Sequence, residues 1–246
     1  MRRVDYDAVA ATYNTRYDRN RYEGVRDALW KFIGDARDVD VAEIGCGTGH
    51  WLAELAGKVQ SISGIDPSWG MLQRAAADAR GALLVQARAE ALPVASLSVD
   101  RVFCINAFHH FTDRAAFARE ARRILRPGGC VMTVGLDPHT GLDRWWVYDY
   151  FPSALDADRA RYPSTATIRA VLDDAGFAET TTSVAQHVPV TRPFSVALER
   201  GHLDRTATSQ LMVISDEDYA AGIQRMTAER PVLNSDLRLF ATIARV

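Results

Sequence analysis

Short apolar runs alternate with helical patterns from residue 39 onward, and this alternation limits the chain to a small set of folds. It is the signature of βαβ units, which build a parallel sheet through right-handed crossovers. The predicted strands are 39–44, 60–65, 82–86, 99–105 and 130–136, and the predicted helices between them are 50–57, 68–80 and 113–125. We therefore expect an α/β fold in which helices cover both faces of a doubly wound sheet.

The alternation breaks after residue 136, and residues 137–163 are predicted to form a lid. Within them the stretch DRWWVYDYFP, at 143–152, is dense in aromatic residues. Its large side chains suit either the wall of an apolar substrate pocket or the lid's own core. The residues in question are Trp145, Trp146, Tyr148, Tyr150 and Phe151. Both readings predict a packed cap rather than a flexible loop.

Residues 164–246 are predicted to return to the core sheet, whereas 1–136 carry an N-terminal arm and the main ligand-binding core. Side-chain oxygens that cap the first turn mark the starts of two helices. The predicted elements are a helix at 164–175 after Ser164, a strand at 177–188, an insertion at 191–231 with a helix after Ser215, and a closing strand at 237–246.

The charge balance argues against a nucleic-acid partner. The 246 residues carry a formal net charge of -2, and no block of like charges provides the basic surface that phosphate backbones require. No apolar run approaches the roughly 20 residues of a membrane helix. The N-terminal residues Arg2 and Arg3 are not followed by the apolar core of a signal peptide. We expect a cytoplasmic protein that does not contact membranes, as a monomer or homodimer.

The cysteines give no sign of a metal site. Cys46, Cys104 and Cys130 lie far apart, without the paired spacing of zinc ligands or of a secreted disulfide framework. We predict that they are small buried residues in a reducing compartment and that the protein holds no metal.

The stretch EIGCGTGH, at 43–50, follows the first predicted strand and precedes a helix. Dinucleotide-binding proteins carry G-x-G-x-x-G there, and counted from Gly45 the third glycine position is His50. The Lys-Ser/Thr ending of a phosphate-binding P-loop is also missing. The loop therefore favours a ligand that approaches the backbone closely but has no phosphates.

Asp66 follows the second strand, about twenty residues past the glycines. A carboxylate there accepts charge-assisted hydrogen bonds from both hydroxyls of a ribose. The alternative is that Asp66 or Ser68 only caps the helix after Pro67. We favour the ribose, because the glycine loop and the acid occur in the expected order on consecutive strand ends.

Five motifs in order resemble the class I S-adenosylmethionine-dependent methyltransferases, in particular the small-molecule branch similar to ubiquinone and menaquinone biosynthesis methylases. The motifs are EIGCGTG, GIDPS, ARAEALP, FCINAFHHF and EARRILRPGG. The match covers residues 5 to 136 well, but it fixes neither 137–163 nor 191–231. It implies a seven-stranded Rossmann-like sheet whose last strand is antiparallel, and S-adenosylmethionine as cofactor with S-adenosylhomocysteine as product.

The resemblance also implies roles for single residues. Glu43, Gly45, Cys46 and Gly47 would line the methionine part of the cofactor, and Asn106 would contact its amino group. Asp66 would hold the ribose, while Pro67, Met71, Ala89 and Glu90 would surround the adenine. Arg88 departs from the pattern, because many relatives carry there an Asp that accepts a hydrogen bond from adenine, and a guanidinium accepts none.

Relatives of this kind begin with a helix whose tyrosine and arginine close over the cofactor. The stretch TYNTRYDRNRY offers two frames, Tyr13 with Arg16 or Tyr17 with Arg21. A tyrosine face attracts a sulfonium through cation–π interaction. The alternative is an amphipathic helix that packs its tyrosines on the core.

Methyl transfer is an in-line displacement in which positioning and desolvation supply most of the rate. An oxygen nucleophile also loses a proton, and His109 or His110, just past a strand end, suits that role near neutral pH. The alternative is that both histidines only support neighbouring groups. The sequence thus predicts a methyltransferase that acts on a small hydrophobic or aromatic molecule at O, N or C. Its rival is a protein that binds the cofactor without transferring the methyl group.

Overall fold

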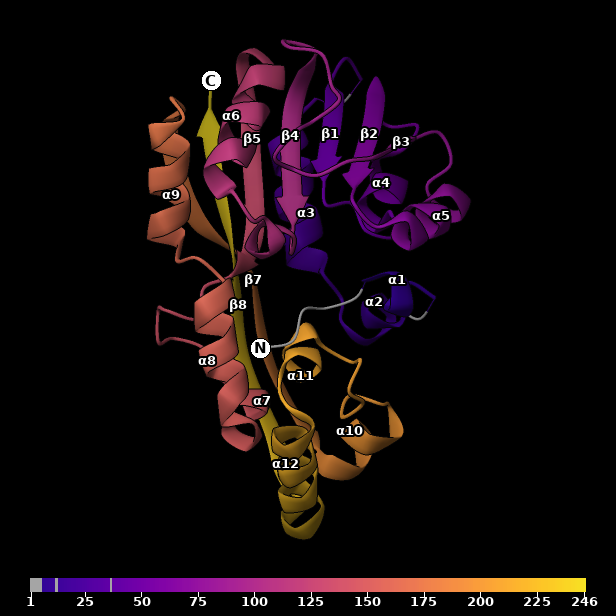
Figure 1. Cartoon of the computed structure of the whole chain (residues 1–246), viewed down its shortest axis with the longest axis vertical. Helices are drawn as coiled ribbons and strands as arrows, with labels where there is room; N and C mark the ends of the chain where they lie inside the picture. Colours follow the sequence, from indigo (N-terminus) through magenta and orange to yellow (C-terminus); the bar gives the residue numbers. More distant parts are fainter. Residues whose placement is uncertain (1–5, 12, 36) are drawn as a thin grey trace.

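A single sheet runs through the computed structural model, which describes residues 6–11, 13–35 and 37–246 (Figure 1). Arg2 and Arg3 lie outside the described residues. The strands, in the order β3-β2-β1-β4-β5-β8-β6 with β7 paired to β8, are β1 (Asp40–Ile44), β2 (Ser61–Asp66), β3 (Leu83–Gln86), β4 (Val99–Ile105), β5 (Leu125–Leu136), β6 (Arg144–Trp145), β7 (Ala178–Pro193) and β8 (Val232–Arg245).

Strands β1 to β5 pair in parallel, whereas β8 is antiparallel to β5, β6 and β7. The predicted doubly wound α/β fold with an antiparallel closing strand is confirmed. The strand beyond the predicted seven is β6, a two-residue piece of the lid that pairs with Asp236 and Ser235. The carboxyl ends of the parallel strands all point downwards in Figure 1, which puts the loops after β1, β2 and β4 at one edge.

Helices cover both faces of this sheet. On one face α3 (Glu23–Ile33), α4 (His50–Leu55) and α5 (Trp69–Asp78) contribute Leu29, Leu52 and Leu72 to a common apolar cluster. On the other face α6 (Arg114–Ile124) and α9 (Thr165–Asp174) bury Phe117 and Leu172. Apolar clusters on both faces of the sheet therefore hold the strands, and the loops at their carboxyl ends, in place.

The predicted helix starts agree with the structure. Ser164 accepts a hydrogen bond from the Thr167 amide at the start of α9. Ser215 accepts one from the Asp218 amide at the start of α12 (Asp216–Glu229). In each case a side-chain oxygen binds an amide that has no partner within the helix.

Strands β7 and β8 are longer than the predicted 177–188 and 237–246 and pair as far as Pro193 and Val232. Proline usually argues against a strand because it lacks an amide hydrogen. Among the described strands β7 pairs only with β8, so Pro189 and Pro193 face a strand edge that needs no amide hydrogen. The insertion between the two strands therefore spans 194–231, which is shorter than the predicted 191–231. Similarly, β5 begins at Leu125, directly after α6, rather than at 130.

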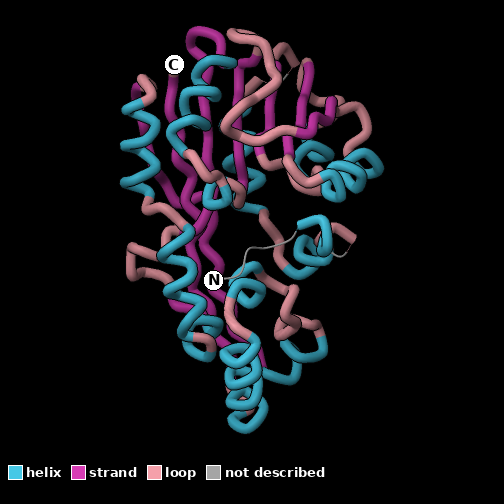
Figure 2. Tube along the Cα trace, in the orientation of Figure 1, coloured by secondary structure: helices cyan, strands magenta, loops and turns pink. Residues whose placement is uncertain are grey.

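The far half of the β7–β8 ribbon extends beyond the core sheet and carries a cap, which forms the lower part of Figures 1 and 2. A separate apolar cluster, which includes Trp146, Phe151, Leu211 and Met226, holds the cap together. Its helices besides α12 are α7 (Trp146–Tyr150), α8 (Pro152–Arg161), α10 (Phe194–Glu199) and α11 (Ser209–Val213).

The N-terminal helices α1 (Tyr6–Val9) and α2 (Thr15–Arg19) lie between the strand edge and the cap (Figure 1). Asp7 ties α1 to the start of α5, because its carboxylate accepts hydrogen bonds from the Ser68 hydroxyl and the Gly70 amide at 2.7 and 2.8 Å. The arm, the strand edge and the cap thus meet around one region.

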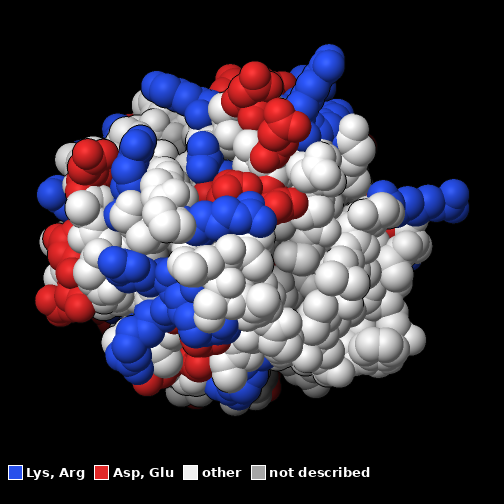
Figure 3. Space-filling model, turned by 90° about the horizontal axis from the view of Figure 1, so that it is seen from above, with Lys and Arg blue, Asp and Glu red and all other residues white. Residues whose placement is uncertain are grey.

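The face opposite the cap carries acidic and basic side chains close to one another (Figure 3). Of the described helices, none has the length and apolar character needed to cross a membrane.

Candidate active site

The glycine loop lies between β1 and α4 and is held against β2. The amides of Gly45 and Cys46 donate to the carbonyl of Ile65 at 2.7 and 3.2 Å. Gly47, with φ 53°, directs its amide at the carboxylate of Asp66, 2.8 Å away. Gly49, with φ 79°, allows α5 to approach, since an added Cβ would lie 2.9 Å from that of Ala75. The close helix packing that dinucleotide-binding proteins obtain from a later glycine is supplied here one residue earlier.

Asp66 is buried at the end of β2 and has two backbone partners. Besides the Gly47 bond, its Oδ1 accepts a hydrogen bond from the Ser68 amide at 2.9 Å. Burial raises the pKa of its carboxyl group, although these two amides oppose the shift. The cap of α5 is Ser68, whose hydroxyl accepts from the Met71 amide. Asp66 therefore does not serve as the helix cap.

Glu43, on β1, is only 1% exposed, and its Oε2 has no hydrogen-bond partner among the described residues. Burial, reinforced by the nearby charge of Asp66, raises its pKa well above the usual value for a carboxyl group. A buried carboxylate without a full set of partners is costly, and a cation beside it removes much of that cost. This position suits a positively charged ligand.

A first cavity of about 210 Å³ opens at this strand edge. It is lined by nearly all the residues predicted to bind the cofactor: Tyr13, Tyr17, Glu43, Gly45, Cys46, Gly47, Asp66, Pro67, Met71, Ala89, Glu90 and Asn106. Arg21 is not among them. Four further lining residues were given no role in the sequence analysis, although Tyr22 and Phe111 end two of the stretches quoted there: Tyr6, Tyr22, Trp51 and Phe111.

The two tyrosine–arginine pairs predicted for the N-terminal arm have different surroundings. Arg16 lines the first cavity and donates a hydrogen bond to the hydroxyl of Tyr13, over whose ring its guanidinium also lies. The side chain of Arg21 is 87% exposed and pairs with Glu23 at 3.5 Å. Tyr17 lines the cavity, and its ring stacks on that of His50 with 3.7 Å between the ring centroids. Tyr13 with Arg16 is thus the pair whose two members both line the first cavity.

At the adenine end predicted from the motifs, Arg88 donates to the hydroxyl of Thr112 at 2.8 Å and pairs with Glu90 at 3.4 Å. Glu90 also accepts hydrogen bonds from the Thr112 hydroxyl and amide. Burial opposes the shift, but these bonds lower the pKa of Glu90 to about 2. Both Arg88 and Glu90 therefore fix the turn at Thr112 while they line the first cavity.

A second cavity, of about 320 Å³, adjoins the first and lies under the cap. Tyr6, Arg16, Asn106 and His110 line both. Asn106 has φ 54°, an uncommon conformation that asparagine tolerates and that is frequent at functional sites. Trp145 and Trp146 line the second cavity, and Phe151 belongs to the cap core. The aromatic stretch thus provides both a pocket wall and a core.

The two predicted histidines lie in the 3-10 turn η1 (Phe108–His110) but in different surroundings. The hydroxyl of Tyr6 and Nε2 of His110 are hydrogen-bonded at 2.6 Å. His109 lines only the second cavity, stacks on Tyr162, and has a buried Nε2 without a partner in the described chain. Burial first, and then the neighbouring positive groups His110 and Arg161, lower its pKa well below the usual value. His109 is therefore neutral near pH 7.

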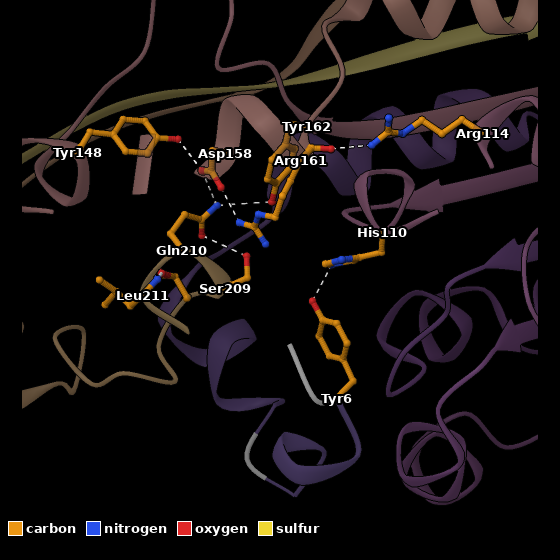
Figure 4. A network of polar contacts seen from close by, with 11 residues as sticks. Tyr6, His110, Arg114, Tyr148, Asp158, Arg161, Tyr162, Ser209, Gln210 and Leu211 are labelled. Carbon is orange, nitrogen blue, oxygen red and sulfur yellow. Dashed lines mark hydrogen bonds and ion pairs between the residues drawn. The ribbon is translucent and has the colours of Figure 1, made fainter. Parts of the chain in front are cut away.

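A polar network joins the cap to this site (Figure 4). Asp158 of α8 is completely buried and binds Arg161 at 2.5 Å, the Tyr148 hydroxyl at 2.8 Å and the Gln210 amide at 2.9 Å. The main-chain carbonyl of Arg161 accepts a hydrogen bond from Arg114 of α6 at 2.7 Å. No group of side chains suited to hold a metal ion occurs within residues 6–11, 13–35 and 37–246.

The fold is that of a Rossmann-like α/β protein, and the first cavity opens at the ends of its parallel strands. A family model described as a methyltransferase domain matches residues 42–133 of this chain. The resemblance inferred from the motifs is confirmed.

Two curated relatives each match up to half of the chain. The malonyl-[acyl-carrier protein] O-methyltransferase of Hahella chejuensis is 33% identical over 50% of this chain and 45% of its own length. The ubiquinone/menaquinone biosynthesis C-methyltransferase of Campylobacter jejuni is 29% identical over 40% of this chain and 45% of its own. The chain thus spans about half the length of these relatives.

Solved structures share the fold across the whole chain. A putative methyltransferase from an antibiotic biosynthesis pathway of Anabaena variabilis superimposes with a TM-score of 0.71 at 22% identity, covering 93% of this chain and 99% of that one. Phosphoethanolamine N-methyltransferase 2 of Haemonchus contortus, solved with S-adenosyl-L-methionine, gives 0.64 at 17% identity, with 99% and 60% covered. At sequence identities this low, the similarity shows a shared fold and nothing more.

Proposed function

We propose that this protein is an S-adenosylmethionine-dependent methyltransferase that acts on a small hydrophobic or aromatic molecule at O, N or C. The cofactor occupies the first cavity and the acceptor the second. The match to the methyltransferase-domain model and the two adjoining cavities support this assignment. Trp145 and Trp146 supply the apolar surface that an acceptor of this class needs.

Glu43 is the observation that carries the proposal. Its carboxylate oxygen Oε2 is buried at the first cavity without a partner among the described residues, and a cation bound there would stabilise it. S-adenosylmethionine is positively charged at its sulfonium and at its amino group, so the donor set fits. A dinucleotide brings negative phosphates instead, which a carboxylate at Glu43 would repel. The rings of Tyr6, Tyr13, Tyr17 and Tyr22 provide further surface that attracts cations.

We assign the ribose hydroxyls to Asp66, whose carboxylate is oriented by the Gly47 and Ser68 amides and lines the first cavity. Arg16, oriented by the Tyr13 hydroxyl, suits the carboxylate end of the cofactor. Pro67, Met71 and Ala89 give an apolar slot for the adenine.

The bound cofactor supplies an electrophilic methyl group. The protein then has to orient the acceptor, exclude water and accept a proton where the acceptor is an alcohol, phenol or amine. His109 is the better placed of the two histidines for the proton, since its Nε2 has no partner among the described residues and the ring is neutral. His110, bonded to Tyr6, suits the positioning of the arm over the cofactor.

Calorimetric titration tests the cofactor. S-adenosylmethionine should bind and NAD should not. Glu43→Gln should weaken S-adenosylmethionine binding about tenfold or more, because a hydrogen bond to a charged partner is lost. It should weaken S-adenosylhomocysteine less, because that molecule lacks the sulfonium charge. The matched control is Glu199→Gln on α10, which is exposed and outside both cavities. Equal loss in both variants would remove Glu43 from the site.

Turnover separates transfer from mere binding. Release of S-adenosylhomocysteine together with a methylated acceptor, detected by mass spectrometry, supports the proposal. Cofactor binding without release across a broad acceptor panel would support a non-catalytic role instead. Single-turnover rates of His109→Ala and His110→Ala then test the base, since a fall of less than about tenfold, roughly 1.4 kcal/mol, excludes that role.

A further inference from the structure

The second cavity has a wall made by one face of the β7–β8 ribbon. Every second residue of β7 from Gln186 to Arg192 lines it, as does every second residue of β8 from Ser235 to Leu239. This is the period with which side chains point to one face of a sheet. The middle of the wall is apolar, with Val188, Val190 and Leu237. Trp145 and Trp146 complete an apolar lining for the body of an acceptor.

The charged groups of this cavity are all basic. Among its described lining residues are Arg16, Arg21 and Arg192, together with His109, His110 and His202, and no Asp or Glu. The first cavity differs, because it contains Glu43, Asp66 and Glu90 beside its arginines. The two cavities therefore attract ligand groups of opposite charge.

Two of the three arginines are already engaged. Arg21 is exposed and pairs with Glu23, and Arg16 binds the Tyr13 hydroxyl at the junction with the first cavity. Arg192 has no carboxylate within ion-pair distance in the described residues, and its guanidinium donates to Nε2 of His202. Burial and the nearby Arg200 lower the pKa of Arg192. A partly buried guanidinium that contacts an imidazole and has no carboxylate partner among the described residues is a site for an anion.

This site lies away from the methyl donor. Gln186 contacts the segment that follows the arm, through hydrogen bonds with Arg21 and Val25, whereas Arg192 is six positions further along β7. Six residues of strand span roughly 20 Å. The cavity thus has one end at Asn106 and His110, beside the first cavity, and another at Arg192 and His202.

We propose that the acceptor is an elongated amphipathic anion. Its carboxylate or phosphate group binds Arg192 and His202, its apolar body lies on the β7–β8 wall, and its other end reaches the methyl donor. This inference rests on the proposed function and narrows the acceptor class to molecules with an anionic group remote from the methylated atom. Neutral and cationic acceptors are disfavoured, because they leave Arg192 without a counter-charge.

A matched series of probes tests this in protein saturated with S-adenosylhomocysteine. The series consists of 6-phenylhexanoate, 6-phenylhexyl phosphate, 6-phenylhexan-1-ol and 6-phenylhexylamine, titrated by calorimetry or by quenching of tryptophan fluorescence. At least one anion should bind about tenfold or more tightly than the alcohol, as expected for charge-assisted hydrogen bonds. The amine should bind weakest. Comparison of the carboxylate probe with the phosphate probe shows which anionic group the site prefers.

Three variants locate the effect. Arg192→Gln should bring the affinity of the preferred anion down to that of the alcohol, whereas Arg192→Lys should keep part of the preference. Arg159→Gln is the control, because Arg159 lies exposed on cap helix α8, outside the cavity, and its loss changes the net charge equally. S-adenosylhomocysteine affinity, measured for each variant, reports whether the protein is folded.

The inference is overturned if the alcohol or the amine binds as well as both anions, if no anion binds, or if the Arg192→Gln protein keeps the full preference for the anion. In each of these cases S-adenosylhomocysteine still binds, so the proposed function stands. Failure of the wild-type protein to bind either form of the cofactor overturns the proposed function itself.

Discussion

The two cavities meet at Asn106 and His110 but are built in different ways. The first consists largely of residues at the ends of consecutive parallel strands, within short motifs such as the glycine loop and Asp66. The second combines residues just after β4 with the β7–β8 ribbon, Tyr162 after α8, and the start of α11. The first is thus tied to the architecture of the fold, whereas the second depends on a cap whose core is separate from that of the sheet. We expect substitutions to affect the two cavities separately.

The largest effect is expected in the cap. Asp158→Ala removes the partner of Arg161, whose side chain is 8% exposed, and leaves a buried charge uncompensated. The free energy of unfolding should fall by about 3–5 kcal/mol. Denaturation by urea measures it, with the exposed Asp156→Ala on the same helix as a control that should change little. A loss as small as that of the control would mean that the network of Figure 4 contributes little to the cap.

The next effect belongs to the first cavity alone. Asp66→Ala should weaken cofactor binding by about 2–4 kcal/mol, because two ribose hydrogen bonds to a charged group are lost. Binding of the preferred anionic probe in the second cavity should stay nearly unchanged. The exposed Asp27→Ala on α3 is the matched control. Unchanged cofactor affinity, measured by calorimetry, would remove Asp66 from the site.

A third prediction concerns the packing of the cap. Gly222 of α12 faces Phe151, and an added Cβ would lie 2.2 Å from a ring carbon and 2.8 Å from the carbonyl oxygen of Tyr150. Gly222→Ala should lower the free energy of unfolding by about 1–3 kcal/mol through overpacking. This outweighs the roughly 1 kcal/mol that alanine gains in a helix. Ala221→Ser, exposed on the same helix, is the control, and a more stable Gly222→Ala protein would show that α12 is free to move.

The contrast between the cavities also explains how far the sequence could predict them. The strand-end residues lie in local motifs: the glycine loop and Asp66 are recognisable from their spacing and Glu43 from the resemblance, and all line the first cavity. Arg192 and His202 lie on either side of Pro193 in a segment that was assigned to an insertion. Their role depends on the pairing of β7 with β8, a contact between residues some forty positions apart, such as Thr191 with Asn234. No local pattern encodes such a pairing.

The choice between the two tyrosine–arginine pairs of the N-terminal arm could likewise not be predicted from local sequence. Tyr13 with Arg16 and Tyr17 with Arg21 have similar spacing, and either suits a short helix. The difference arises from tertiary contacts. Tyr17 stacks on His50 and Arg21 pairs with Glu23, so that of the two arginines only Arg16 lines the first cavity.

The smallest effect is a pH dependence at the boundary between the cavities. His109 is buried with its pKa held well below the usual value, so the folded protein keeps the ring neutral while the unfolded chain protonates it near pH 6.5. The unfolded state then binds more protons, and stability falls as the pH drops below about 6.5. His109→Gln lacks this titration, so its free energy of unfolding should decline less steeply between pH 7 and pH 5 than that of the wild type. Urea denaturation at several pH values measures both slopes. Parallel slopes would mean that His109 is protonated as readily in the folded protein as in the unfolded chain, and would remove the argument for it as a neutral proton acceptor beside the second cavity.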